Sequence, residues 1–132
     1  MSKLAKALSG AAGSAGGDPL YVEDVFSTYL YTGTGSSNPI NNGIDLSGEG
    51  GLVWGKRRNL GNSHWLINTV NGIASRLESD GTGAATDKST SFTSFNSNGF
   101  TVASTDNEFN NANGDYASWT FRKAEKFFDV VT

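Results

Sequence analysis

The segment YASWTFR, residues 116–122, alternates apolar and polar side chains throughout its length. Ala117, Trp119 and Phe121 fall on one face of an extended chain, and the residues between them are polar. A period of two is typical of a β-strand with one face buried. We therefore expect a strand here, with Trp119 and Phe121 in the core.

Similar short runs recur along the chain and are separated by stretches rich in Gly, Asn, Ser and Thr. The turn NSNG at 96–99 between two such runs is a strong hairpin signal, because Asn and Gly tolerate the positive φ of tight turns. The run at 73–79 is the weakest and could also form a helical turn. The expected strands are 22–32, 52–58, 65–69, 73–79, 92–95, 100–103, 116–122 and 127–131.

Many short strands joined by turns, without alternating long helices, predict an all-β fold, an antiparallel β-sandwich of the jelly-roll type. The chain of 132 residues is long enough for one such core. We expect the core to contain Trp54, Trp65, Phe95, Phe100, Trp119 and Phe121.

Composition excludes several classes of protein. The chain has no cysteine, so disulfides and thiolate metal sites are ruled out. A net charge of −3 argues against a nucleic-acid binder, which would carry a concentrated basic stripe. No stretch approaches the roughly 18 apolar residues of a membrane span, and no apolar segment of the signal-peptide type follows Lys3 and Lys6.

Residues 1–20 differ in composition from the rest and are expected to form a flexible N-terminal arm. The segment 10–17, GAAGSAGG, has the composition of a linker. A helix over the first nine residues would place a small apolar stripe beside a basic edge. The residues of this candidate partner-binding motif are Lys3, Leu4, Lys6 and Leu8. The alternative is a spacer that never orders.

The sequence indicates no catalytic residue and no cofactor. His64 is the one histidine and lies at the start of an apolar run without a nucleophile motif, so we expect a strand-end residue with a backbone hydrogen bond. Glycosidases place paired carboxylates on strands facing a groove. Here most acidic residues lie in turns: Asp45, Glu49, Glu78, Asp80, Asp87, Asp106, Glu108 and Asp115.

Two further clusters have both functional and structural interpretations. The loop DNEFNNANGD, residues 106–115, is rich in oxygen ligands, but it lacks the EF-hand order, and Asn and Asp also form turns. Whether it binds Ca²⁺ stays open. The basic cluster 56–58 cannot place all three side chains on one strand face, and we interpret it as a solvated edge that discourages stray pairing.

The apolar runs also carry a set of phrases in a fixed order. They are YLYTGTG (29–35), NGIDLSGEGGLVWGKRR (42–58), HWLINTVNG (64–72), TSFNSNGFTVAS (93–104) and YASWTFRKAEKFFDVVT (116–132). Over residues 21–132 they resemble a domain of tail fibres and other virion proteins of tailed phages, many of them marine. The resemblance implies a concanavalin-A-like (laminin-G-like) jelly roll.

The chain departs from the resembling pattern at two positions. Gly55 stands where a bulky apolar residue is usual, and Glu125 where a proline is common. Both changes put local strand geometry in question. We expect two parts in this chain, an arm at 1–20 and a sandwich at 21–132. In the resembling proteins the phrase FFDVVT continues into a second sandwich, so a continuation past Thr132 is an open alternative.

The resemblance implies a structural protein of the virion tail, made in the host cytoplasm and acting by assembly with other tail proteins and by host adsorption. A homotrimer is the expected oligomer, because phage fibres are commonly built from three chains. Two alternatives stay open. One is a carbohydrate-binding module for host surface glycans, which would expose aromatics such as Tyr29, Tyr31 or Tyr116 in a groove. The other is a capsid-decorating protein.

Overall fold

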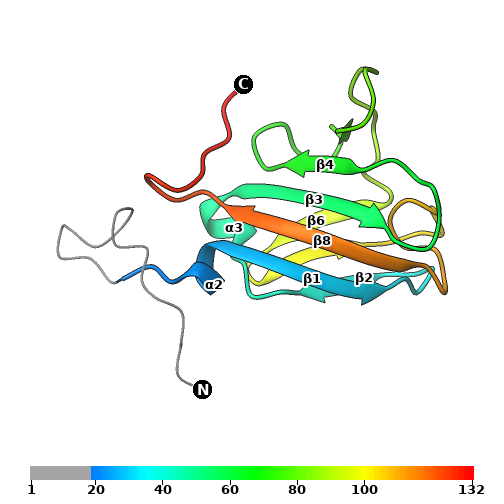
Figure 1. Cartoon of the computed structure of the whole chain (residues 1–132), viewed down its shortest axis with the longest axis horizontal. Coiled ribbons are helices and arrows are strands. Elements are labelled where there is room, and N and C mark those ends of the chain that lie inside the picture. The colour runs from blue at the N-terminus through cyan, green and yellow to red at the C-terminus, as the bar shows by residue number, and fades with distance from the viewer. Residues whose placement is uncertain (1–18) are drawn as a thin grey trace.

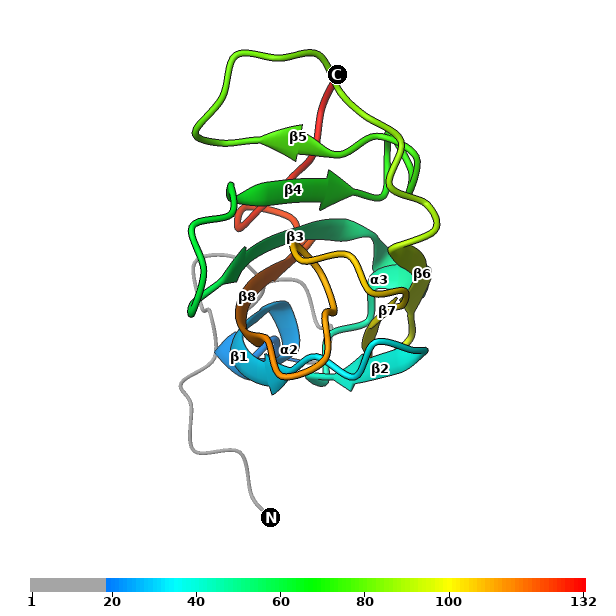
Figure 2. The ribbon, with the colours of Figure 1, turned by 90° about the vertical axis from the view of Figure 1, so that its right-hand side faces the viewer.

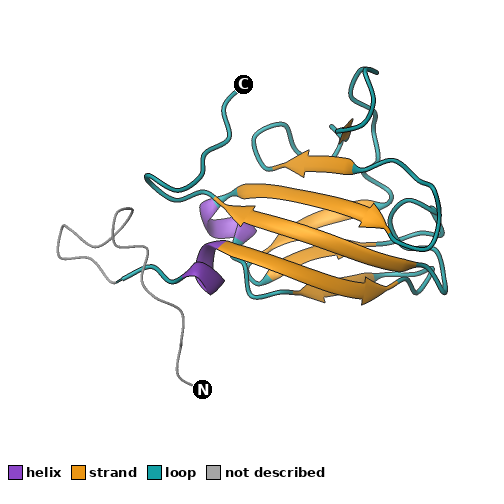
Figure 3. Cartoon of the chain, viewed as in Figure 1, coloured by secondary structure: helices purple, strands orange, loops and turns teal. Residues whose placement is uncertain are grey.

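The computed structural model describes residues 19–132 and contains two antiparallel β-sheets and two short helices (Figures 1 and 3). It is an all-β sandwich, as predicted. Its helices are α2 (Val22–Val25) and α3 (Leu46–Glu49). Its strands are β1 (Phe26–Thr32), β2 (Asn38–Asn41), β3 (Gly51–Arg57), β4 (Trp65–Asn68), β5 (Leu77–Glu78), β6 (Phe92–Asn96), β7 (Gly99–Val102) and β8 (Asp115–Arg122).

The larger sheet has five strands in the order β1-β8-β3-β4-β5, and the smaller has three in the order β2-β7-β6. Figure 2 shows the larger sheet curving around the smaller one, with β1 and β2 side by side at one border of the sandwich. The central strand β8 comes last in the sequence and pairs with both β1 and β3. The larger sheet is therefore completed only when the two ends of the described chain meet.

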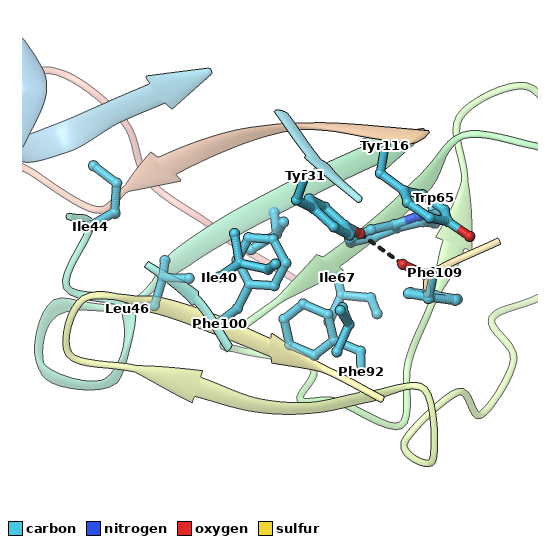
Figure 4. Packing of buried hydrophobic residues seen from close by; sticks show 12 residues of the cluster. Tyr31, Ile40, Ile44, Leu46, Trp65, Ile67, Phe92, Phe100, Phe109 and Tyr116 are labelled. Atoms are coloured by element: carbon cyan, nitrogen blue, oxygen red, sulfur yellow. Dashed lines mark hydrogen bonds between the residues drawn. The ribbon is translucent and has the colours of Figure 1, made fainter. Parts of the chain in front are cut away.

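The core lies between the sheets, and half of the residues in its buried cluster are aromatic (Figure 4). The Trp65 and Phe109 rings stack with centroids 4.5 Å apart, and the Phe92 and Phe100 rings stack at 5.4 Å. Such contacts add to the burial of large rings. The buried cluster consists of Tyr31, Ile40, Ile44, Leu46, Val53, Trp65, Ile67, Phe92, Phe100, Val102, Phe109 and Tyr116.

The prediction that Trp119 and Phe121 lie in the core is wrong. Both are only half-buried, as is Trp54, which pairs with Trp119 across β3 and β8. The alternation predicted for β8 is correct, but the opposite face points inward, with Tyr116 fully buried. The predicted core residues Trp65 and Phe100 are fully buried, and Phe95 is partly buried against the core cluster.

Gly55 explains one departure from the resembling pattern. It lies opposite Trp65 in the β3–β4 register, and a Cβ atom on it would overlap the Trp65 indole. On its other side Gly55 pairs with Ser118 of β8, which is also small. The two small residues leave room for the large ring of Trp65 on the inner face of the sheet.

The predicted hairpin at 96–99 is confirmed. Asn96 pairs with Gly99, which joins β6 and β7 through a turn of two residues. Within residues 96–99 only Gly99 has a positive φ, of 148°, and a side chain there would overlap the Ile40 carbonyl of β2. The glycine therefore serves both the turn and the close approach of β2.

Three predicted elements differ from the structure. Val22–Val25 is a helical turn, stabilised where the Asp24 carboxylate accepts a hydrogen bond from the Tyr21 N–H at 3.1 Å. Residues 73–79 are mostly turn, and β5 is confined to Leu77–Glu78. Residues 127–131 do not form a strand, because a turn closed by the bridge between Ala124 and Phe128 reverses the chain.

The predicted arm lies almost entirely outside the described residues, which begin at Pro19. No helix within the described part of the chain is long and apolar enough to cross a membrane.

Candidate functional site

The outer face of the larger sheet, turned away from the core, is mostly apolar. Trp54 lies beside Trp119 on one side and Leu66 on the other, and Leu52 lies beside Phe121. Residues directly opposite each other on neighbouring strands share a face of the sheet. We name this surface the outer apolar face, and it comprises Phe26, Leu30, Leu52, Trp54, Leu66, Leu77, Ala117, Trp119 and Phe121.

Two leucines at opposite borders of this face are the most exposed. Leu30 on β1 is 57 % exposed and Leu77 on β5 is 38 % exposed. The tryptophans and leucines between them are half-buried, and only Ala117 is buried. The larger sheet thus carries apolar side chains on both faces, whereas an antiparallel sheet with one solvated face usually alternates apolar and polar residues.

Trp54, Trp119 and His64 form a cluster at the centre of this face. The indole rings lie 5.4 Å apart at 53°, and the Trp54 Nε1 donates a hydrogen bond to the His64 Nδ1 at 3.0 Å. His64 precedes β4 directly, as predicted, and its backbone N–H donates to the Asp80 carboxylate at 3.0 Å. The imidazole therefore contacts an indole, and no hydroxyl donates to it within the described residues.

An aromatic stack extends this face towards the C-terminal turn. Phe26 of β1 lies 5.0 Å from Phe121 of β8, and Phe128 lies 5.2 Å from Phe121. Beside the stack is an open hollow of about 640 Å³, bordered by residues 123–129 and Glu49. Its charges are of both signs, and Lys123 pairs with Asp129 at 3.2 Å.

A buried ion-pair network is the densest group of charges in the described chain. Arg76 pairs with Glu108, which is 4 % exposed. The Nη1 of Arg76 also lies 2.6 Å from the Glu78 Oε1. Lys88 lies 2.9 Å from the Asp106 carboxylate and 3.7 Å from that of Glu108. The network ties Arg76, just before β5, and Lys88, in the connection between β5 and β6, to the loop between β7 and β8.

Two of the three carboxyl groups of this network, those of Asp106 and Glu108, have pKa values shifted in opposite directions. Burial raises the pKa of Glu108, although Arg76 and Lys88 act to lower it. Burial acts to raise the pKa of Asp106 as well, but hydrogen bonds from Lys88, Ser91 and the Glu108 N–H, with the charge of Lys88, leave that pKa lowered. Each carboxylate is already engaged by a cation of the chain, so the network has the character of a structural clasp.

The loop at 106–115 directs its polar groups into the protein. Asn110 is fully buried, and its Oδ1 accepts hydrogen bonds from the Thr34 N–H at 3.1 Å and the Asn38 Nδ2 at 3.0 Å. Its Nδ2 donates to the Ser36 carbonyl at 2.6 Å. Within residues 19–132 no group of three or more His, Asp or Glu side chains converges as a metal site would require.

The basic cluster does not form a patch. Arg57 points inward and is 9 % exposed, and its guanidinium lies 5.9 Å from the centre of the Tyr116 ring. Lys56 lies on the opposite face, where its Nζ donates to the Leu60 carbonyl at 3.0 Å. The prediction that these side chains cannot share a face is confirmed. Their interpretation as a solvated edge is wrong, because β3 lies between β8 and β4.

The tyrosines considered for glycan binding do not line a groove. Tyr31 and Tyr116 stack in the core with centroids 5.0 Å apart, and their hydroxyls donate to the carbonyls of Phe109 and Asn107, both at 2.9 Å (Figure 4). Burial, with a smaller contribution from Tyr116, raises the pKa of Tyr31 well above its ordinary value. Tyr29 alone is exposed, at 37 %.

The predicted partner-binding residues Lys3, Leu4, Lys6 and Leu8 lie outside the described residues. The outer apolar face was not among the features predicted from the sequence. A signal for it is present in β3, where Leu52 and Trp54 alternate with Gly51, Val53 and Gly55. A strand with apolar or small residues at successive positions is expected to be covered on both faces.

The fold and this face together define a two-sheet β-sandwich whose larger sheet has an uncovered apolar side within the described chain. The chain belongs to the family DUF7483, a domain of unknown function, which matches residues 22–127. No curated protein and no solved structure matches the chain.

Proposed function

We propose that this domain is a non-catalytic structural module of a bacteriophage virion, a tail fibre or the portion of one that attaches to the tail. It is made in the host cytoplasm and acts by contact with other virion proteins. The observation that supports this proposal is the outer apolar face, to which β1, β3, β4, β5 and β8 all contribute. The order of the sequence phrases supports the phage context.

The surface of the larger sheet is the physical basis of the proposal. A soluble monomer rarely exposes a continuous apolar patch larger than a few hundred Å², and larger patches mark contact surfaces. The exposed side chains of Leu30 and Leu77 lie at opposite borders of the sheet, with Trp54 and Trp119 between them. A protein surface that covers the whole sheet would remove all of them from water together.

The test measures incorporation into particles. Leu77→Glu places a charge on the outer apolar face at an exposed position, so the domain should fold but be missing from purified particles. Asn41→Glu is the matched control, because it adds the same charge at an exposed position of the smaller sheet. Normal copy number of the Leu77→Glu protein in particles contradicts a role for this face. Absence of the wild-type protein from purified particles contradicts the virion proposal itself.

A carbohydrate-binding function is the second candidate, and the Trp54–Trp119 pair favours it. Indole rings offer flat apolar surfaces with a polar edge, and the apolar faces of sugar rings pack on such surfaces. Binding of oligosaccharides would change the tryptophan fluorescence of the wild-type chain, and Trp119→Ala would remove that change. Unchanged fluorescence across host-surface glycans contradicts this candidate.

A further inference from the structure

The four edge strands of the sandwich differ in how well they are protected. The larger sheet ends at β1 and β5, and the smaller sheet at β2 and β6. β5 is only two residues long, β2 contains Pro39, and the register of β6 shifts between Phe92 and Ser94. Short strands, prolines and irregular registers are the usual means of keeping an edge from pairing with another chain.

β1 has none of these protections. Its sequence FSTYLYT contains no charge, proline or glycine, and its seven residues pair with β8 in an unbroken register. Thr28, Tyr29, Leu30 and Thr32 are exposed. An uncharged, regular and exposed edge strand of this length is a template for strand addition.

The backbone of β1 has hydrogen-bonding groups to offer at its free edge. In an antiparallel pair, opposite residues alternate between hydrogen-bonded and non-hydrogen-bonded pairs. Gly33 N–H bonds to the Gly114 carbonyl at 2.8 Å, one step beyond the Thr32–Asp115 pair. The N–H and C=O groups of Thr28 and Leu30 therefore point away from β8. No strand of the described chain pairs with them.

We propose that β1 pairs antiparallel with β1 of a second copy of this chain, about a two-fold axis at Tyr29. Tyr29 is the middle residue of Phe26–Thr32, so this register centres on the free groups of Thr28 and Leu30. At the ends of the strand, the Phe26 N–H already bonds to the Val22 carbonyl and the Thr32 carbonyl accepts a hydrogen bond from the Asn38 Nδ2. The register places Thr28 opposite Leu30 of the second copy. The free N–H and C=O groups of each of these residues then face those of the other. The pairing joins the two larger sheets, and their outer apolar faces become continuous.

A second copy suits this edge better than another partner strand for two reasons. β1 carries no charge, so self-pairing places no like charges opposite each other. A head-to-tail extension of the sheet would have to use β5, and its two residues are too few. Pairing of the same edge with itself gives a closed two-fold dimer.

The dimer is a property of the isolated protein and goes beyond the proposed function. An experiment can therefore contradict either proposal without affecting the other. Edge pairing gives a two-fold dimer, which differs from the trimer that the phage resemblance implies. A dimer in solution would support the edge pairing whether or not the protein belongs to a virion.

The first experiment measures the mass of the full-length protein in solution by sedimentation equilibrium. The wild-type chain should have twice the 13.9 kDa of one chain. Thr28→Lys/Leu30→Lys places lysines directly opposite lysines and should give a monomer. Thr28→Pro removes an outward N–H that β8 does not use, and it should also give a monomer.

The matched control is Leu77→Lys/Ser79→Lys, which adds the same two charges at the other border of the larger sheet and should remain dimeric. Circular dichroism verifies the fold of each variant. The proposal is overturned by a monomeric or trimeric wild-type chain, or by β1 variants that fold and remain dimers. Dissociation of the control overturns it as well, because the contact would then involve the outer apolar face.

A second experiment tests the axis. The chain has no cysteine, so Tyr29→Cys introduces a single thiol. Opposite Cβ atoms across a non-hydrogen-bonded antiparallel pair lie about 4.5–5.5 Å apart, close enough for a disulfide after a small adjustment. Mild oxidation should convert Tyr29→Cys to a covalent dimer and leave Leu77→Cys monomeric in denaturing electrophoresis. Failure of Tyr29→Cys to cross-link overturns the two-fold register.

Discussion

At the scale of single residues, the packing of Trp65 depends on the absence of a side chain at Gly55. A methyl group there would overlap the indole, and the fully buried ring packs against Phe92, Phe100 and Phe109. We expect Gly55→Ala to lower the free energy of unfolding by about 1–3 kcal/mol. Gly61→Ala is the control, because no atom lies within 4 Å of a Cβ at that position. Equal urea midpoints for the two variants would contradict this account.

The two tryptophans on opposite faces of the larger sheet should differ in their contribution to stability. Trp65 is fully buried, and its Nε1 donates to the Glu108 carbonyl at 3.1 Å, so Trp65→Ala should cost about 3–5 kcal/mol. Trp119 is half-buried on the outer face, so Trp119→Ala should cost about 1–2 kcal/mol. Thermal or urea unfolding of both variants measures the difference. A larger loss of unfolding free energy for Trp119→Ala than for Trp65→Ala would contradict this difference.

At the scale of elements, the sequence predicts most strands, because alternation and turn residues are local signals. β8 shows the limit of this reasoning. A period of two separates the faces of a strand, but it does not say which face is inside. The larger apolar residues, Trp119 and Phe121, lie outside, while Ser118 and Thr120 lie inside. Ser118 lies beside Gly55, and Gly55 lies against the Trp65 ring, so the fit of this face depends on three strands together.

The candidate site was harder to predict than the strands. The outer apolar face and the free edge of β1 exist only once the strand order is known, since FSTYLYT reads the same in a central strand as in an edge strand. The C-terminal turn shows the same dependence. The run at 127–131 looks like a strand, but Phe128 packs on Phe121 and the chain reverses.

The ion-pair network makes stability depend on pH. The pKa of Asp106 is lower in the folded protein than in the unfolded chain, so its contribution is fully present above the ordinary value of 3.8 and is lost as pH falls from there through the lowered pKa of the folded state. Glu108 has a raised pKa and opposes this trend, because its contribution is lost as pH rises.

Asp106→Asn tests the lowered pKa directly. We expect the variant to be less stable than wild type near neutral pH, and the difference to shrink below about pH 4. Urea unfolding at a series of pH values measures it. Glu125→Gln, at an exposed position, is the control and should follow the wild-type curve. A difference that grows as the pH falls would show that the sign assigned to Asp106 is wrong.

At the scale of the whole molecule, the larger sheet has two kinds of contact to offer. Its free β1 edge presents backbone groups, and its outer apolar face presents side chains. Edge pairing leaves the outer apolar face of both copies uncovered, so a dimer could still bind a further protein there. Under the two proposals together, one sandwich would join a copy of itself through β1 and attach to another protein through the outer apolar face.

The last prediction concerns the N-terminal segment, whose Gly/Ala/Ser linker precedes the family match at residues 22–127. Deletion of residues 2–17 should leave the melting temperature unchanged, because the core cluster begins at Tyr31. If Leu4, Leu8 and the two lysines anchor the domain, the truncated protein should be missing from purified particles. A variant with Leu4 and Leu8 both changed to Ser keeps the length of the segment and should be missing as well. Incorporation of the truncated protein at normal copy number would mean that the segment is only a spacer, and that attachment depends on the sandwich.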